Sequence, residues 1–320
     1  MNVAEFTTRM TKEAEKLILG KRDRIELILM AFLADGHVLL DDMPGVGKTT
    51  LVKTLALASG CLSKRVQFVP DLLPADILGM NIYDQKTGDF RFLSGPVFTN
   101  ILLADEINRA IPRTQSALLE AMEEKCVTID GVTTQLPKPF MVMATQNPVE
   151  SESAFRLPAA QMDRFLIKLS MGYPEPEEEK QMLLSLGDVM PFDSVEAVSS
   201  PEDIVALREE VAGVRVTDEV AEYIVALITA TRNFPGVAMG ASPRASRAMY
   251  RAAKAWAAMH GRDFVTPDDV KYLAKFVLPH RILLSGEARI SGITAETVVE
   301  RIMGELPVPP LKACVFDGKE

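Results

Sequence analysis

A glycine-rich segment at residues 41–50, DDMPGVGKTT, contains the residue types that bind a triphosphate. Gly45 and Gly47 have no side chain, so the backbone can turn tightly and direct its N–H groups toward phosphate oxygens at the start of a following helix. Lys48 would reach the β- and γ-phosphates, and the Thr49 hydroxyl would be a magnesium ligand. The segment therefore predicts a nucleotide site whose binding residues are Pro44, Gly45, Val46, Gly47, Lys48, Thr49 and Thr50.

One position departs from the usual pattern. The motif G-x-x-x-x-G-K-[ST] has a glycine where this chain has Asp42, and the alternative interpretation is an ordinary glycine-rich turn. The flanking residues favour the motif, because 37–40 form a short apolar run typical of a buried strand and 49–59 have helical apolar spacing. The carboxylate of Asp42 should face away from the phosphates, since repulsion would weaken binding.

A second apolar strand at residues 100–106 ends in two adjacent acids. Ligands of open parallel sheets bind at the carboxyl ends of the strands, so Asp105 and Glu106 should lie in the same crevice as the glycine-rich turn. Asp105 would hold magnesium, mostly through water, and Glu106 would polarise the attacking water. The alternative is a strand followed by a helix cap, which the joint presence of the phosphate loop disfavours.

A third apolar strand at residues 140–145 ends just before Asn147. A neutral amide at this strand end can hydrogen-bond both a γ-phosphate oxygen and the lytic water without adding charge. The alternative is a turn asparagine that precedes Pro148.

Composition excludes several other classes of protein. The chain has 320 residues, 48% of them apolar, and a formal net charge of −9. This acidity argues against broad contact with nucleic acid. The three cysteines and three histidines are too far apart in the sequence to suggest disulfides or a zinc site. No segment reads as a leader or a membrane span, so no membrane insertion and a cytoplasmic location are expected.

The order of these motifs resembles that of an AAA+ ATPase, and their amino-acid sequences are similar to those of the MoxR branch. The resemblance spans nearly the whole chain and is carried by HVLLDDMPGVGKTT, ILLADEINRAIPRTQSALLEAMEE, MATQNPVE, LPAAQMDRF and GASPRASRA. It implies an α/β fold, with an αβα core around a parallel sheet followed by a smaller all-helical lid. It also implies ATP and Mg²⁺ as cofactors and a homo-oligomeric ring, usually a hexamer. A separate partner with a von Willebrand factor A domain is a further implication.

The resemblance also implies roles for arginines. Arg244 matches the sensor 2 position, and the local sequence agrees, because Ser242 as N-cap and Pro243 at the first helical position would place Arg244 in the first turn of a lid helix. Arg164 matches the arginine finger that acts on a neighbouring subunit's ATP, and Arg156 is a second candidate. The alternative for Arg164 is an intramolecular pair with an acid. The catalytic set is therefore Glu106, Asn147, Arg164 and Arg244.

Two hairpins and one domain boundary complete the prediction. Residues 78–92 and 127–133 read as hairpins, the second with an Asp-Gly pair suited to a type I′ turn. By resemblance they would face the centre of a ring and contact a client, and the alternative is that they only pack against the core. Prolines at 174 and 176 predict domains at 1–173, the nucleotide-binding core, and 174–320, the lid.

Together these features predict an enzyme that hydrolyses ATP to ADP and phosphate to drive chaperone-like remodelling or maturation of a partner complex. The remodelling part rests on the resemblance alone. The alternatives are an AAA+ motor that acts on nucleic acid and a P-loop kinase for a small molecule. A non-catalytic nucleotide-binding module is a third.

Overall fold

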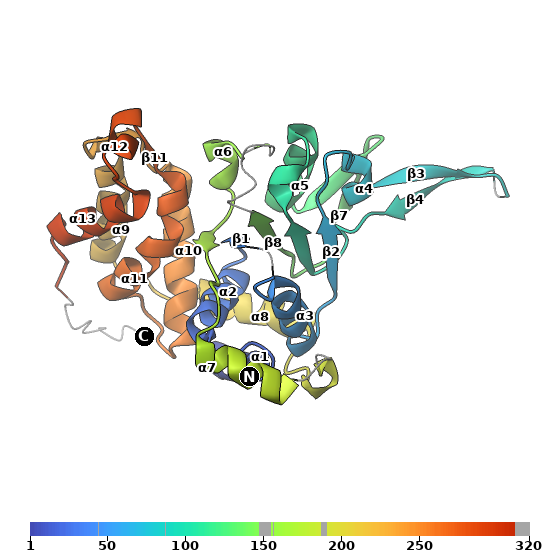
Figure 1. Ribbon diagram of the computed structural model, residues 1–320, viewed down its shortest axis with the longest axis horizontal. Helices are drawn as coiled ribbons and strands as arrows, with labels where there is room; N and C mark the ends of the chain where they lie inside the picture. Colours follow the sequence, from blue (N-terminus) through green and yellow to red (C-terminus); the bar gives the residue numbers. More distant parts are fainter. Residues whose placement is uncertain (44, 87, 147–154, 156, 187–190, 311–320) are drawn as a thin grey trace, which may run out of the picture. The chain divides into compact units, whose positions relative to one another are not determined.

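The computed structural model describes residues 1–43, 45–86, 88–146, 155, 157–186 and 191–310. The chain divides into two compact units, Met1–Glu210 and Val211–Glu320. The first unit holds the sheet and the second is mainly helical (Figure 1). Within the described residues, no helix is both long enough and apolar enough to cross a bilayer.

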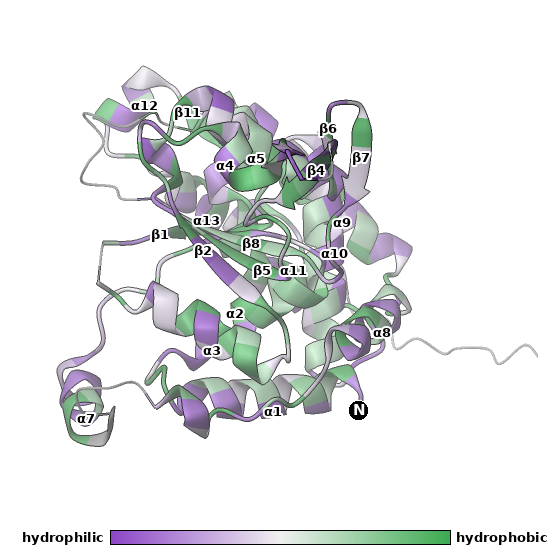
Figure 2. Ribbon diagram, turned by 90° about the vertical axis from the view of Figure 1, so that its right-hand side faces the viewer, coloured by the Kyte–Doolittle hydropathy of each residue, from purple (hydrophilic) through white to green (hydrophobic). Residues whose placement is uncertain are grey.

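A five-stranded parallel sheet organises the first unit, in the order β2-β5-β8-β1-β9. The middle strands are almost wholly buried because they are apolar over most of their length, and they appear green in Figure 2. The edge strand β2 is polar and mostly exposed. The strands are β1 (Val38–Asp41), β2 (Ser63–Gln67), β5 (Ile101–Asp105), β8 (Met141–Gln146) and β9 (Ile167–Leu169).

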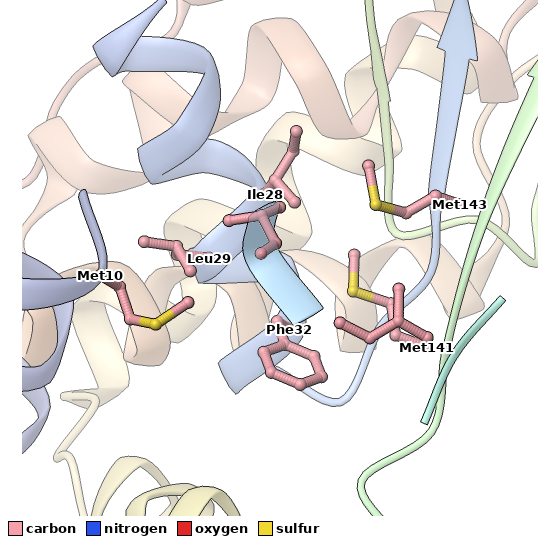
Figure 3. Close-up of a pocket in the computed structure, with 8 residues that line it drawn as sticks. Met10, Ile28, Leu29, Phe32, Met141 and Met143 are labelled. Atoms are coloured by element: carbon pink, nitrogen blue, oxygen red, sulfur yellow. The ribbon is translucent and has the colours of Figure 1, made fainter. Parts of the chain in front are cut away.

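Helices cover both faces of this sheet. On one face, Leu102 and Val142 pack with Leu118 and Met122 of α5 (Pro112–Glu124), beside the short α4 (Pro74–Leu78). The other face carries α1 (Val3–Glu15), α2 (Arg22–Leu33) and α3 (Lys48–Ala58). There, a small apolar cavity lies among side chains of these helices and of β5 and β8 (Figure 3); its lining residues are Met10, Ile28, Leu29, Phe32, Leu55, Ile101, Met141 and Met143.

Both predicted hairpins are present. The first pairs β3 (Gly79–Asp84) with β4 (Asp89–Ser94) and extends away from the sheet of its unit (Figure 1). The second pairs β6 (Cys126–Ile129) with β7 (Val132–Gln135). Its turn residues have positive φ, 51° at Asp130 and 79° at Gly131, which confirms the predicted type I′ geometry.

The chain after β9 remains attached to the first unit through α7 (Pro176–Leu186), η2 (Phe192–Ser194) and α8 (Pro201–Ala212). Arg208 of α8 donates to the carbonyl oxygen of Phe32 at 2.7 Å and to Asp35 Oδ1 at 2.5 Å. These contacts place the division between the compact units near the end of α8. The predicted domain ranges, 1–173 and 174–320, differ from this division and stay a prediction.

The second unit packs its helices through apolar faces, with a two-stranded sheet beside them. Ser242 caps α10, as the sequence predicts, while Thr217 caps α9 and Thr266 forms a capping box with Asp269 before α11. Trp256 is 9% exposed and stacks on Tyr272, so it belongs to the packed interior. The elements are α9 (Asp218–Asn233), β10 (Val237–Met239), α10 (Pro243–Met259), α11 (Pro267–Val277), η3 (Pro279–Arg281), β11 (Leu283–Leu284), α12 (Gly286–Ile290) and α13 (Ala295–Glu305).

Candidate nucleotide site

The glycine-rich turn joins β1 to α3, as the sequence predicts. Gly45 and Gly47 have φ of 89° and 82°, a conformation that favours glycine, and nothing lies within 4 Å of where a Cβ would be. Gly47 is the N-cap of α3, so Lys48, Thr49 and Thr50 form the first turn of that helix. The open space and the helix N-terminus suit an anion such as a phosphate group.

Asp42 faces away from this turn, as expected from its charge. Its carboxylate accepts hydrogen bonds from Ser170 Oγ at 2.7 Å and from the backbone N–H groups of Met171 and Gly172 at 2.8 and 3.1 Å. Its own carbonyl oxygen accepts from Lys48 Nζ at 3.1 Å. Asp42 therefore anchors the chain after β9 and holds the lysine, so the acid is compatible with a phosphate loop.

Asp105 ends β5 and is 9% exposed. Its Oδ1 accepts from Thr145 Oγ1 at 2.7 Å, and its Oδ2 accepts from Arg65 Nη2 at 2.6 Å and Nε at 3.1 Å. Thr145 is fully buried in β8, the neighbour of β5 in the sheet. The position of this carboxylate is thus set by side chains from both strands that flank β5.

Glu106 lies in the left-handed region, with φ of 56° and ψ of 49°. A non-glycine residue there stores backbone strain, which is common at functional sites. Its N–H donates to Thr145 Oγ1 at 2.8 Å. Its carboxylate Oε2 accepts from Gln67 Nε2 at 2.6 Å and from Arg109 Nη1 at 2.9 Å. The residue is therefore held at both its backbone and its side chain.

Three elements of the predicted site meet at one edge of the sheet. The phosphate loop follows β1, the two acids lie at the end of β5, and Gln146 ends β8; these three strands are consecutive neighbours and run parallel. Of the predicted site residues, Pro44 and Asn147 lie outside the described residues, as does Arg156.

The two predicted catalytic arginines lie in different units. Arg164 donates from Nη1 to the carbonyl oxygen of Leu119 at 2.7 Å and pairs with Glu123 Oε2 at 2.8 Å, both on α5. This is the intramolecular arrangement that the sequence left open, and a role in trans stays a prediction. Arg244 is exposed in the first turn of α10, where the Ser242 side chain caps the helix.

The site residues predicted from the sequence do not include Thr145, Arg65, Gln67 or Arg109, all of which contact the two acids. Their signal is weak, because each is a common polar residue in or beside a strand. The register reveals Gln67, since it is paired directly with Asp105 across β2 and β5. That register depends on how segments 38 residues apart align, which local periodicity does not specify.

Oxygen donors at this edge suit a magnesium ion. Magnesium prefers oxygen ligands and usually binds through one or two protein groups plus substrate phosphates, and the Thr49 hydroxyl and the Asp105 carboxylate are of that kind. Among the described residues no group of three or more His, Cys, Asp or Glu could hold a metal by itself. With nucleotide phosphates as its other ligands, a magnesium ion needs no more protein groups than Thr49 and Asp105.

Comparison with known proteins agrees with this geometry. A family described as "ATPase family associated with various cellular activities (AAA)" matches residues 37–167, and an AAA lid domain matches residues 229–302. The chain is 51% identical to the uncharacterized protein YeaC of Bacillus subtilis, over 96% of each chain. It is 42% identical to Chaperone MoxR1 of Mycobacterium tuberculosis, over 96% of this chain and 83% of that protein.

A solved structure shares the whole architecture. The crystal structure of a protein from Cytophaga hutchinsonii, described as an ATPase, is 38% identical and superposes with a TM-score of 0.89 over 96% of both chains. The parallel sheet, the glycine-rich turn and the match over the length of both relatives all point to the same group of nucleotide-binding enzymes. The chain belongs to the MoxR family of AAA+ ATPases, a class of ATP-hydrolysing enzymes.

Proposed function

We propose that this protein binds ATP with Mg²⁺ at the edge formed by β1, β5 and β8 and hydrolyses it to ADP and phosphate. The observation that carries the proposal is the placement of Asp105 and Glu106 at the end of β5, at the same edge of the parallel sheet as the phosphate loop, with only β8 between β5 and β1. Lys48 and the backbone of the loop bind the phosphates, and Thr49 and Asp105 hold the metal, which neutralises charge on the phosphates. Glu106 accepts the proton of the attacking water.

Glu106→Gln tests this assignment. The amide keeps the shape of the side chain but cannot take a proton, so we expect ATP binding to be retained while phosphate release falls by about two orders of magnitude or more. Lys48→Ala should instead weaken ATP binding itself. Fluorescent-nucleotide titration and a phosphate-release assay separate the two effects. Wild-type turnover in Glu106→Gln would remove Glu106 from the mechanism.

We further propose that hydrolysis drives remodelling of a partner protein within a homo-oligomeric ring, most simply a hexamer. One relative is named a chaperone, which supports a protein client, and the partner with a von Willebrand factor A domain would be a separate chain. Arg164 would then act on the ATP of a neighbouring subunit, and Arg244 would act as the sensor 2 residue of the lid. Sedimentation of Glu106→Gln with ATP would give the number of subunits.

The β3–β4 hairpin is the proposed client contact. Five of its apolar side chains are 40–73% exposed: Met80, Ile82, Tyr83, Phe90 and Leu93. Exposed apolar side chains gathered on one projecting element mark interaction surfaces more often than packing surfaces. Asn81 Nδ2 donates to Asp130 Oδ2 at 2.8 Å, so the two hairpins of the first unit touch near this surface.

A trapping experiment tests the client contact. Glu106→Gln with ATP should retain an engaged client in a pull-down, because the ATP-bound state persists. The same protein with Tyr83→Ser and Phe90→Ser added should retain ATP but lose that client. Equal capture by both proteins would remove the hairpin from client binding.

A further inference from the structure

The edge strand β2 presents two polar side chains, Arg65 and Gln67, to the two acids of the site. Arg65 donates from Nη2 to Asp105 Oδ2 at 2.6 Å and also to Gln67 Oε1 at 2.7 Å. Gln67 in turn donates from Nε2 to Glu106 Oε2 at 2.6 Å. One continuous path of hydrogen bonds therefore links Asp105 to Glu106 through β2.

The strand geometry explains why these two residues act together. Side chains alternate along a strand, so Arg65 and Gln67 project from the same side of β2 while Val66 is buried on the other. In the parallel register Gln67 lies opposite Asp105, and Arg65 lies opposite Leu103. The long arginine side chain reaches forward to Asp105, where a shorter residue would fall short.

The two oxygens of Asp105 are not equivalent. Oδ1 accepts from the fully buried Thr145, whereas Oδ2 is held by Arg65, whose side chain is 50% exposed. A metal ion and the guanidinium are both attracted to this carboxylate, and as like charges they repel each other. Arg65 at Oδ2 therefore opposes the binding of a cation to Asp105.

We propose that Arg65 is a positioning residue that competes with the magnesium ion for Asp105 and so sets the magnesium concentration at which the site is loaded. The inference rests on the proposed function, in which Asp105 binds the metal. Removing Arg65 strengthens magnesium binding, because the carboxylate loses a competing partner. A partly exposed ion pair is weak, so the expected change in affinity is about two- to fivefold.

The test is titration calorimetry of MgCl₂ into the full chain saturated with ADP, which reads binding without turnover. Arg65→Gln should lower the dissociation constant for Mg²⁺ by about two- to fivefold. Lys64→Gln is the matched control, because it removes the same charge from the adjacent, exposed position on the opposite side of β2 and should leave the constant unchanged. Thermal unfolding by circular dichroism verifies that each variant is folded.

Two further variants separate the inference from the function on which it rests. Asp105→Asn should weaken Mg²⁺ binding, and an unchanged constant there would overturn the assignment of the metal to Asp105. If Asp105→Asn behaves as expected but Arg65→Gln leaves the constant unchanged or raises it, the competition is overturned and the site stands. Should Arg65→Gln fail to fold, Arg65→Lys takes its place. Lysine cannot reproduce the paired Nε and Nη2 donors, so the dissociation constant for Mg²⁺ should still fall, but by less than with glutamine because the positive charge remains. No fall would equally overturn the inference.

Discussion

Thr145 supplies one hydroxyl to two groups of the site. It donates to Asp105 Oδ1 and accepts from the N–H of Glu106, both at under 3 Å, and it is fully buried. The second bond supports the left-handed backbone at Glu106, a conformation that costs energy unless its surroundings hold it. The rotamer of one threonine therefore affects the proposed metal ligand and the proposed base together.

Thr145→Val should therefore lower both stability and rate. Valine keeps the shape but leaves the Glu106 N–H without its acceptor, at a cost of about 1–3 kcal/mol in the free energy of unfolding. We expect phosphate release to fall about tenfold, the equivalent of 1.4 kcal/mol in the barrier. Urea unfolding and a phosphate-release assay measure the two effects. Thr145→Ser retains the hydroxyl and should stay near wild type; equal loss in both variants would contradict a role for the hydroxyl.

His37 illustrates a residue with a structural role. It is buried, its Nδ1 accepts from the N–H of Val142 at 2.9 Å, and its Nε2 lies 3.0 Å from the carbonyl oxygen of Met122. Nε2 therefore carries the proton in the neutral ring. Burial is the main cause that lowers the pKa of His37 to about 4 from its ordinary value of 6.5. Both ring nitrogens of His37 are therefore engaged within the protein.

The sign of the resulting pH effect follows from proton binding. Between pH 6.5 and 4 the unfolded chain binds a proton at His37 that the folded chain does not, so stability falls as the pH falls through this window. Between pH 7 and 5 the loss should be about 2 kcal/mol. His37→Gln can keep both hydrogen bonds but does not titrate, so its loss over the same range should be smaller by that amount. Urea unfolding at each pH gives the free energy of unfolding. An equal loss between pH 7 and 5 in both proteins would contradict the assignment of this pH effect to His37.

At the scale of the elements, Asp42 connects the ends of two neighbouring strands. It directly follows β1, and its carboxylate holds the three residues that directly follow β9. The same residue fixes Lys48 through its carbonyl oxygen. The position that departs from the strict phosphate-loop motif thus joins the loop to the edge of the sheet.

Asp42→Ala should destabilise the first unit. It removes three hydrogen bonds to a charged acceptor, and we expect the free energy of unfolding to fall by about 3 kcal/mol. Asp42→Asn is the matched control: it keeps one acceptor oxygen, so a loss of about 1 kcal/mol is expected. Urea unfolding measures both changes. If the alanine variant were as stable as wild type, the carboxylate would not be an anchor.

At the scale of the whole molecule, the proposed role of Arg164 in trans depends on the proposed ring. In the single chain its guanidinium pairs with Glu123, so action on a neighbour's ATP requires that pair to open. A partly exposed pair of this kind is weak enough, at about 0.2–1 kcal/mol, for a phosphate group to compete with it. The intramolecular pair therefore does not oppose a role in trans.

Mixing two inactive variants tests that role. Arg164→Ala and Glu106→Gln should each be nearly inactive alone. In mixed rings, an Arg164→Ala subunit with its own Glu106 can receive Arg164 from a Glu106→Gln neighbour, so phosphate release should partly recover. Absence of recovery under conditions where sedimentation shows assembly would contradict action in trans. Glu123→Gln, which frees Arg164 from its pair, should leave the recovery intact.

Much of the fold follows from local sequence. The positive φ values at Gly45, Gly47 and the Asp130-Gly131 turn, and the cap at Ser242, agree with the predictions because each depends on the dihedral preferences of a few adjacent residues. The buried strands are also predicted from the sequence, since a run of apolar residues that ends in polar ones is typical of a strand in a parallel sheet. The turn and the strands were enough to predict the phosphate loop and the acid pair, and the resemblance of five motif segments predicted the family.

Only the tertiary structure decided the partners of these residues. The hydrogen bonds around the site join segments 39–130 residues apart. Asp42 bonds to residues 170–172, Thr145 bonds to both acids, and Arg65 bonds to Asp105. The hydrogen bonds from Arg208 to Phe32 and Asp35 likewise hold α8 against the first unit. Such contacts depend on strand order and register, which are set by packing of the whole core rather than by any local pattern. The sequence alone therefore determined which residues can bind and cleave a nucleotide, and the fold determined which neighbours hold them in place.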